Sequence, residues 1–247
     1  MSFISYYYSD KIVLSMSGAY EAKRDQHRAL YNSVENLSIA SGLPKPKVYV
    51  INDPAPNAFA TGRDPKHAVV AATTGLLEIL SEAELEGVIG HELSHVKNYD
   101  TRYMVLVSVL VGAISILGDW MIRGSLFGGR SRDRDNQGGN IMMIVGLIFI
   151  VISPIIGQLI KFAISRQREY LADASGALLT RYPEGLARAL EKISQHAQPV
   201  AKTSNATAHL WIADPQGGEG GILSKFANLF ATHPPILERV RRLRGMT

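Results

Sequence analysis

The sequence of 247 residues contains no cysteine, which excludes disulfide bonds, thiolate nucleophiles and cysteine-ligated metal sites. Charged residues are also few, at 19%, whereas hydrophobic residues make up an ordinary 46%. A shortage of charge on this scale indicates that part of the surface faces something other than water. The N-terminal segment MSFISYYYSDK has neither a basic start nor a long apolar run, so we expect no signal peptide.

The net charge is only +4, and no basic run is interleaved with aromatic residues. We therefore do not expect nucleic acid as a partner, although a small positive charge suits an anionic membrane surface.

Two long stretches of the chain, residues 103–118 and 136–160, carry no charged residue. A membrane-spanning helix needs about 20 predominantly apolar residues, so the two stretches predict a helical hairpin inserted in a lipid bilayer. The alternative is a very apolar hairpin within the core of a soluble protein. The basic residues at the two ends of the hairpin are too evenly balanced for charge to decide its orientation.

Before the hairpin, the pattern predicts a largely helical region over 11–42 and then three short strands, over 47–51, 58–61 and 68–73. Glycine and proline between the second and third strands favour an antiparallel pair. Ser81 followed by Glu84 three residues later is a capping box, which predicts that a helix begins there.

After the hairpin, helices are predicted through SRQREYLADASGALLTR, over 184–196, and at the C-terminus, where two prolines open the segment. The sequence thus predicts an α+β fold, mostly helical, with a small antiparallel sheet and an inserted transmembrane hairpin.

The strongest chemical motif is H-E-x-x-H at His91, Glu92 and His95, on the helix that follows the capping box. Histidines four residues apart on a helix lie on one face, one turn apart, which suits two ligands of one tetrahedral Zn²⁺. Zinc lowers the pKa of a bound water from about 15.7 toward about 7. Glu92 would accept the proton of that water as it attacks a carbonyl carbon. The alternative to a metal site is an ordinary polar helix surface that carries two histidines near a glutamate.

A catalytic zinc needs a third protein ligand, and no histidine occurs between His95 and His196. Glu169 and Asp173 stand four residues apart on the helix after the hairpin. Glu169 is a candidate for the third ligand, and Asp173 could accept a hydrogen bond from the ring of a ligating histidine. On spacing alone, two ordinary surface acids explain the pair equally well.

Four segments in order, NAFATG, HELSHVKNYDT, REYLADASGA and ATHPPILERV, resemble the HtpX-like branch of the M48 metallopeptidases, which are membrane-embedded gluzincins with a zincin-type fold. The resemblance covers nearly the whole chain. It implies that one zinc ion per chain is held by His91, His95 and Glu169, with Glu92 as the catalytic base and Asp173 supporting a ligand.

The resemblance also implies roles for residues that spacing alone does not single out. Asn57 and Ala58 lie in a segment that resembles the family's substrate-binding edge strand. His233 and Arg239 match the motif H-P-P-x-x-x-R, whose histidine and arginine lie near the active site in the family. They could stabilise the oxyanion of the tetrahedral intermediate. The alternative is a histidine fixed by two prolines and an ordinary ion-paired arginine.

The family implies a peptidase of misfolded or membrane proteins in the bacterial inner membrane, with several membrane passes and its site facing the cytoplasm. We expect three parts: residues 1–102 and 161–247 as the two parts of the peptidase domain, and 103–160 as the hairpin. Family members usually begin with two further transmembrane helices, and this sequence starts where they would end. A peptidase for lipidated C-termini and a non-catalytic membrane-tethered scaffold are the competing interpretations.

Overall fold

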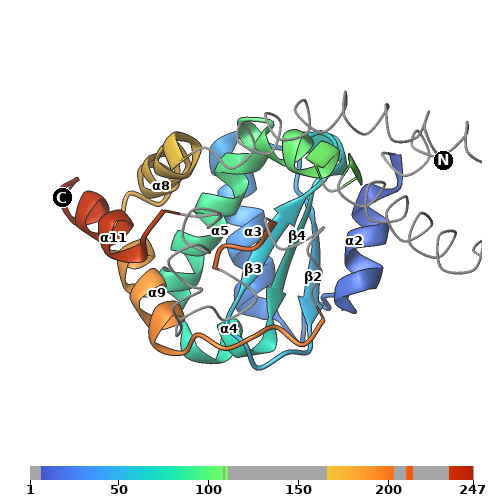
Figure 1. Ribbon diagram of the computed structural model, residues 1–247, viewed down its shortest axis with the longest axis horizontal. Coiled ribbons are helices and arrows are strands. Elements are labelled where there is room, and N and C mark those ends of the chain that lie inside the picture. The colour runs from blue at the N-terminus through green and yellow to red at the C-terminus, as the bar shows by residue number, and fades with distance from the viewer. Residues whose placement is uncertain (1–6, 108, 111–165, 203–209, 214–233, 247) are drawn as a thin grey trace, which may run out of the picture.

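A computed structural model describes residues 7–107, 109–110, 166–202, 210–213 and 234–246 (Figure 1). The elements before the predicted hairpin are α2 (Ser9–Ser17), β1 (Tyr20–Glu21), α3 (Arg28–Ser41), β2 (Lys47–Ile51), β3 (Ala58–Thr61), a 3₁₀ turn (Pro65–His67), β4 (Val69–Thr73), α4 (Thr74–Ile79) and α5 (Glu82–Lys97). Those after it are α8 (Arg166–Thr180), α9 (Pro183–Gln195) and α11 (Ile236–Arg244).

The sheet has the strand order β1-β2-β4-β3, and it is mixed. β3 and β4 are antiparallel, as predicted, and β1 is antiparallel to β2, but β2 and β4 run parallel. The predicted all-antiparallel sheet is therefore wrong. β3 lies at the outer edge of the sheet, beyond β4. The chain turns back from β3 into β4, which lies between β3 and β2 and runs parallel to β2. Local patterns contain no information on this order.

The predicted helical region 11–42 contains two helices, α2 and α3, with β1 between them. α2 ends at Gly18, whose φ of 67° is left-handed, and its backbone N–H closes the helix on Leu14 and Ser15. The helix at the capping box is confirmed, since the backbone N–H of Ser81 donates to Oε2 of Glu84 at 2.8 Å. The helix predicted over 184–196 is also confirmed, as α9.

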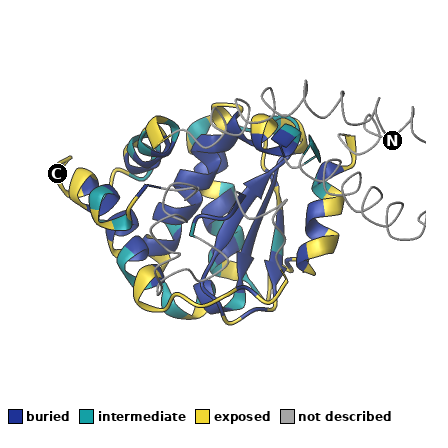
Figure 2. Cartoon of the chain, in the orientation of Figure 1, coloured by how far each residue is buried: buried dark blue, intermediate teal, exposed yellow. Residues whose placement is uncertain are grey.

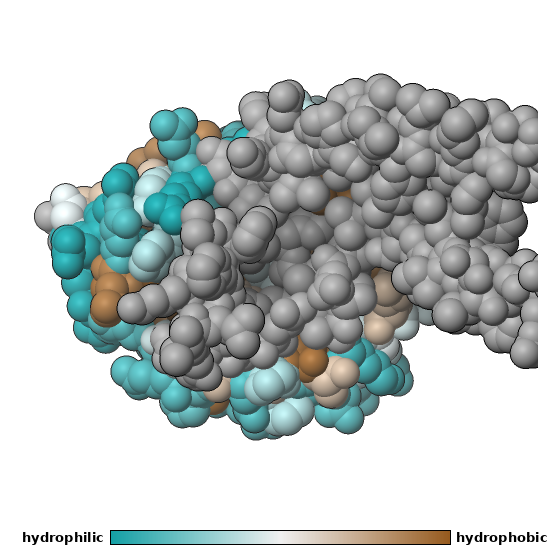
Figure 3. Space-filling model, in the orientation of Figure 1, coloured by the Kyte–Doolittle hydropathy of each residue, from teal (hydrophilic) through white to brown (hydrophobic). Residues whose placement is uncertain are grey.

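Strands β3 and β4 are buried on both faces, which Figure 2 shows as a dark blue centre. Val70 and Ala72 of β4 pack with α3, α5 and α9, while Val69 and Ala71 pack with α2 on the other face. The alanines of β3 and β4 allow α5 to lie close to the sheet. At the end formed by α9 and α11, the surface in Figure 3 is largely hydrophilic, and Arg244 pairs there with Glu184 and Glu191.

Among the described residues, no helix combines the length and the apolar character that crossing a membrane requires. The predicted hairpin lies outside the described residues from 111 onward. Only its beginning, residues 103–107 and 109–110, is described, as helix. Elements from both sides of this segment pack together, because α5 contacts both α8 and α9.

α5 and α8 touch through glycine. A Cβ on Gly176 would lie 2.7 Å from the backbone nitrogen of His91, and one on Gly90 would lie 3.3 Å from the carbonyl oxygen of Gly176. Only glycine permits this approach, which brings the helix that carries Glu169 against the helix that carries the two histidines.

We expect Gly176→Ala to push α8 away from α5 and to lower the free energy of unfolding by about 1–3 kcal/mol, as overpacking does. Thermal or urea unfolding measures this. Gly245→Ala is the control, since Gly245 has a helical φ of −76° and a Cβ on it would lie 3.4 Å from its nearest neighbouring atom. Equal stability of the two variants would contradict the packing argument.

Candidate metal centre

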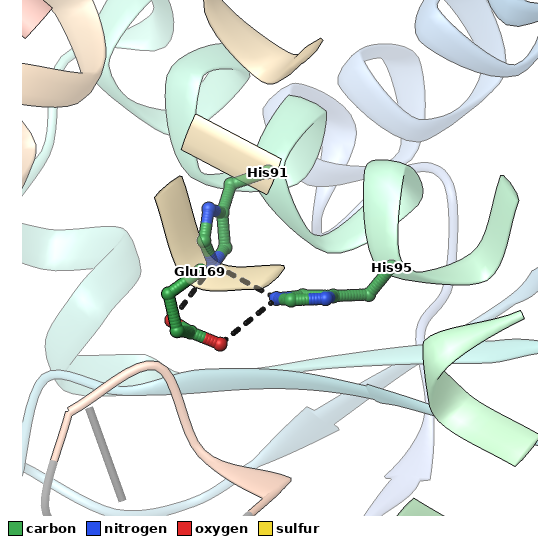
Figure 4. A group of neighbouring side chains, drawn as sticks. All are labelled: His91, His95 and Glu169. Atoms are coloured by element: carbon green, nitrogen blue, oxygen red, sulfur yellow. Dashed lines mark hydrogen bonds and ion pairs between the residues drawn. The ribbon is translucent and has the colours of Figure 1, made fainter. Parts of the chain in front are cut away.

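Three side chains from two helices converge on one point (Figure 4). α5 provides His91 and His95, and α8 provides Glu169, and all three are buried. Nε2 of His95 lies 3.2 Å from Nε2 of His91 and 3.3 Å from Oε1 of Glu169, and Nε2 of His91 lies 3.8 Å from Oε2 of Glu169. The structure thus brings together the three residues that were predicted as ligands.

These separations match the edges of a metal coordination tetrahedron. Zinc binds imidazole nitrogen and carboxylate oxygen at about 2.0–2.2 Å, which places two ligand atoms about 3.4 Å apart. The three observed distances lie close to that length. The donor set of two imidazoles and one carboxylate also suits zinc.

The tautomers of both histidines follow from their partners on the other ring nitrogen. Nδ1 of His91 lies 2.9 Å from Oδ1 of Asp173, and Nδ1 of His95 lies 3.0 Å from Oδ2 of Asp100. A carboxylate accepts a hydrogen bond, so each Nδ1 carries the proton and each Nε2 presents a lone pair. Two lone pairs facing each other at 3.2 Å repel unless a cation lies between them.

Each of these aspartates is held by an arginine. Arg239 donates from Nε to Oδ2 of Asp173 at 2.9 Å and from Nη2 to Oδ1 at 2.7 Å, which is a bidentate pair. Arg168 donates from Nη1 to Oδ1 of Asp100 at 2.6 Å. Burial raises the pKa of Asp173, but Arg239 and His91 outweigh burial and lower it to about 2. Asp173 is therefore ionised at neutral pH and orients the ring of His91.

The surrounding carboxylates favour positive charge at this point. Burial by itself lowers the pKa of His95. With no metal bound, a second proton on Nε2 would let the ring donate to Glu169 as well as to Asp100, and these two hydrogen bonds outweigh burial and raise the pKa to about 10. A metal cation supplies the same positive charge without a proton, so the electrostatics of the pocket suit a divalent cation.

Glu92 lies on α5 beside the three ligands, and its side chain is buried. Burial raises the pKa of its carboxyl group, and the nearby His91 and His95 and a hydrogen bond from the backbone N–H of Ala60 offset this only in part. α5 therefore places the carboxylate between the metal ligands and strand β3. A raised pKa makes a carboxylate a stronger acceptor of protons.

Arg239 reaches the centre from α11 and is completely buried. Its Nη1 lies 3.8 Å from Oε2 of Glu169 and has no hydrogen-bond partner among the described residues. The structure therefore places Arg239 at the centre, as the family motif implies. His233, the other residue of that motif, lies outside the described residues.

Asn57 and Ala58 lie at the start of β3, and both are bonded to another part of the chain. Oδ1 and Nδ2 of Asn57 bond to the backbone of Ala213, and the carbonyl oxygen of Ala58 accepts from the N–H of Ile212 at 2.9 Å. Their predicted contact with substrate remains a prediction.

Comparison with known proteins agrees with this geometry. The profile of Peptidase family M48 matches residues 24–247. The chain belongs to this family. It is similar to proteins named Protease HtpX homolog, with 53% identity in Dictyoglomus thermophilum over 99% of this chain and 78% of that protein. The corresponding protein of Thermoanaerobacter pseudethanolicus is 49% identical over 100% of this chain and 81% of its own.

The chain also resembles the crystal structure of S. mikatae Ste24p, with a TM-score of 0.53. The likeness covers 98% of this chain and 57% of that chain, at 19% identity, and so supports the fold alone. With the M48 family match and the HtpX homologues, the chain is identified as a metallopeptidase. The family is metal-dependent, and the cluster of His91, His95 and Glu169 is able to hold the ion.

Sequence reasoning missed Asp100 and Arg168. Asp100 stands five residues after His95, beyond the end of α5, where helical spacing does not apply. Arg168 directly precedes Glu169 and comes 68 residues after Asp100. The only available signal was the acid soon after H-E-x-x-H, because a ligating histidine in a metallopeptidase commonly donates its other N–H to a carboxylate.

We expect Asp100→Asn and Asp173→Asn each to weaken metal binding by about 10- to 100-fold, as loss of a carboxylate behind a histidine ligand does. Metal-chelator competition measures the affinity. Asp25→Asn is the control, since Asp25 is exposed and lies in the loop before α3, outside the two helices that carry the candidate ligands. Wild-type affinity in both variants would contradict the assigned tautomers.

Proposed function

We propose that this M48 metallopeptidase is a zinc-dependent endopeptidase that hydrolyses peptide bonds of misfolded or membrane proteins, with Glu92 as the general base. The observation that carries the proposal is the convergence of His91, His95 and Glu169 beside the buried carboxylate of Glu92. Catalytic zinc sites have three protein ligands, whereas structural sites are normally closed by four. Three ligands and an adjacent base support catalysis over a non-catalytic scaffold.

His91, His95 and Glu169 would hold the zinc ion, which when bound acts as a Lewis acid toward water and the substrate carbonyl. The chain provides the rigid frame for this chemistry. Asp173 and Asp100 fix the two imidazole rings, and their arginines fix the two aspartates. The frame is thus organised before substrate binds, which reduces the reorganisation needed during the reaction.

Glu92 accepts the proton of the attacking water on its carboxylate and then donates it to the amine that leaves the peptide. Its raised pKa supports both steps, because a carboxylate with a normal pKa holds a proton poorly at neutral pH. The hydrogen bond from Ala60 fixes the carboxylate while it changes protonation state.

Arg239 supports the reaction in two ways. Its bidentate pair with Asp173 holds the partner of His91 in place. Its Nη1, free of hydrogen bonds within the described part of the chain, can donate to the oxyanion that develops on the substrate carbonyl.

The substrate class and the location rest on the sequence. The two uncharged stretches within 103–160 support insertion in a lipid bilayer, and we propose the bacterial inner membrane with the site on the cytoplasmic side. A site close to the membrane surface would meet misfolded or membrane proteins.

We expect Glu92→Gln to retain about one bound zinc per chain and to lower casein cleavage by about 10²–10⁴-fold or more, the usual effect of removing a general base. Metal analysis and a cleavage assay on the same sample measure this. Glu82→Gln is the matched control, since Glu82 is exposed on the same helix. Undiminished cleavage by Glu92→Gln would exclude the base assignment.

Arg239→Lys and Arg239→Ala separate the two roles of Arg239. Alanine leaves Asp173 buried without its partner and should lower the free energy of unfolding by about 3–5 kcal/mol. Lysine keeps the positive charge and most of the stability but loses the fork geometry, so kcat should fall while zinc content stays unchanged. Wild-type kcat in Arg239→Lys would refute a catalytic role.

A further inference from the structure

A cavity of about 520 Å³ lies at the start of α2, where three parts of the chain meet. Its walls come from the start of α2, the first residue of β2 and the turn between β3 and β4. β2 and β4 run parallel, with Lys47 opposite Val69, so both strands begin at this end of the sheet. α2 is tied to the same end, because Nη1 of Arg63 donates to the backbone carbonyl oxygen of Tyr7 at 3.1 Å.

The walls of this cavity carry more positive than negative charge. The lysine, arginine and acidic side chains that line it are three cations and one acid, namely Lys11, Lys47, Arg63 and Asp10. Arg63 and His67, which also lines the cavity, both contact Asp64, at 3.6 and 2.7 Å. Lys11 and Lys47, in contrast, form no ion pair with any residue that the structure describes. Two unpaired ammonium groups on one cavity favour an anionic ligand.

The outer face of α2 continues the cavity with an apolar stripe. Tyr8, Ile12 and Met16 are spaced by four residues, which places them on one face of the helix. Their exposed fractions are 51%, 42% and 47%. The inner face is apolar as well, since Val13 and Leu14 are buried against the sheet. A surface helix that faces water usually has one apolar face, turned to the core, so the outer stripe of α2 suits a less polar surrounding than water.

The first uncharged stretch of the chain, residues 103–118, begins beside α2. Met104 is buried in the same cluster as Val13 and Leu14 of α2. Figure 1 shows α2 on the opposite side of the molecule from α11. If the uncharged stretch enters the bilayer, as the proposed function states, α2 and the cavity lie at the level of the lipid headgroups.

We propose that this cavity binds the headgroup of an anionic phospholipid and that the apolar stripe of α2 contacts the adjoining acyl chains. Lys11 and Lys47 pair with the phosphate and with the further negative charge that distinguishes an anionic headgroup. Nζ of Lys11 and Cζ of Arg63 each lie 5.1 Å from the ring centre of a tyrosine, Tyr8 and Tyr7 respectively. Tyrosine is typical of the boundary between membrane and water.

The apolar stripe favours a lipid over a free phosphate ion. A phosphate ion in the cavity would leave Tyr8, Ile12 and Met16 in water, whereas a lipid covers them as well as the cations. A helix with an apolar face and flanking lysines is the usual form of a helix that lies in the membrane surface. The inference rests on the membrane location that is part of the proposed function.

Because the chain has no cysteine, one introduced cysteine gives a site-specific test in the full-length protein. Ile12→Cys is labelled with bimane and reconstituted in vesicles of phosphatidylcholine and phosphatidylglycerol. We expect phosphatidylglycerol with a nitroxide on its acyl chain to quench the label more strongly than phosphatidylcholine with the same nitroxide. Arg241→Cys, at an exposed position on α11, is the control and should be quenched by neither lipid.

Equal quenching by the two lipids would overturn the anionic headgroup site. A label that neither the lipids nor aqueous iodide can quench would mean that the chain itself covers this face of α2, and would also overturn the proposal. Quenching by iodide alone would place the face in water, with the same consequence.

The two unpaired lysines are tested in the labelled Ile12→Cys protein. We expect Lys11→Gln and Lys47→Gln each to raise the mole fraction of nitroxide phosphatidylglycerol at half-maximal quenching by about fivefold, the usual contribution of a cation near an anionic surface. Arg28→Gln is the control, since Arg28 is an exposed cation on α3, which packs on the other face of the sheet. No change in either lysine variant would refute the headgroup site.

Inorganic phosphate distinguishes the two sources of an anion. At an ionic strength matched with chloride, phosphate should leave the quenching unchanged, and displacement of the lipid by phosphate would make the cavity a site for a free anion. Quenching needs neither zinc nor cleavage, so it is independent of the Glu92→Gln assay. Retention of the protein on the vesicles after an alkaline wash tests membrane insertion separately from headgroup binding.

Discussion

The metal centre depends on one kind of contact, used twice: a buried aspartate that accepts the Nδ1–H of a histidine and is itself held by an arginine. Asp173 and Arg239 hold His91, and Asp100 and Arg168 hold His95. Without these contacts either ring nitrogen could carry the proton. With them, both Nε2 lone pairs face the carboxylate of Glu169, an arrangement that only a cation stabilises.

These contacts also explain why charged side chains occur in the interior. Glu92, Glu169, Asp173 and Arg239 are all buried, and an isolated buried charge is costly. Here each charge has a partner of opposite sign or a hydrogen-bond donor, so the cost is offset locally. The same arrangement makes the centre sensitive to single substitutions, because removal of one partner leaves the other charge uncompensated.

The centre joins parts of the chain that are far apart in the sequence. α5 and α8 approach closely at Gly90 and Gly176, which sets the distance from Glu169 to the histidines. α11 then brings Arg239, and β3 brings the N–H of Ala60 to Glu92. Residues 210–213 lie against β3 beside this point, where Trp211 forms an isolated bridge with Phe59. The fold serves the chemistry by fixing four elements around one position.

The sequence by itself determined what depends on local spacing. H-E-x-x-H on a capped helix placed two candidate ligands and the candidate base on one turn, because a helix repeats every 3.6 residues. Three of the four strands in the described part of the chain were also predicted at their bounds or within one residue of them. Spacing alone explained Glu169 equally well as a metal ligand and as an ordinary surface acid, and the family resemblance selected the ligand. Tertiary structure alone decided the mixed sheet, the role of Asp100, and the pairing of Asn57 with Ala213. These contacts join residues whose separation along the chain follows no helical or strand period, so only the packing of the folded chain could define them.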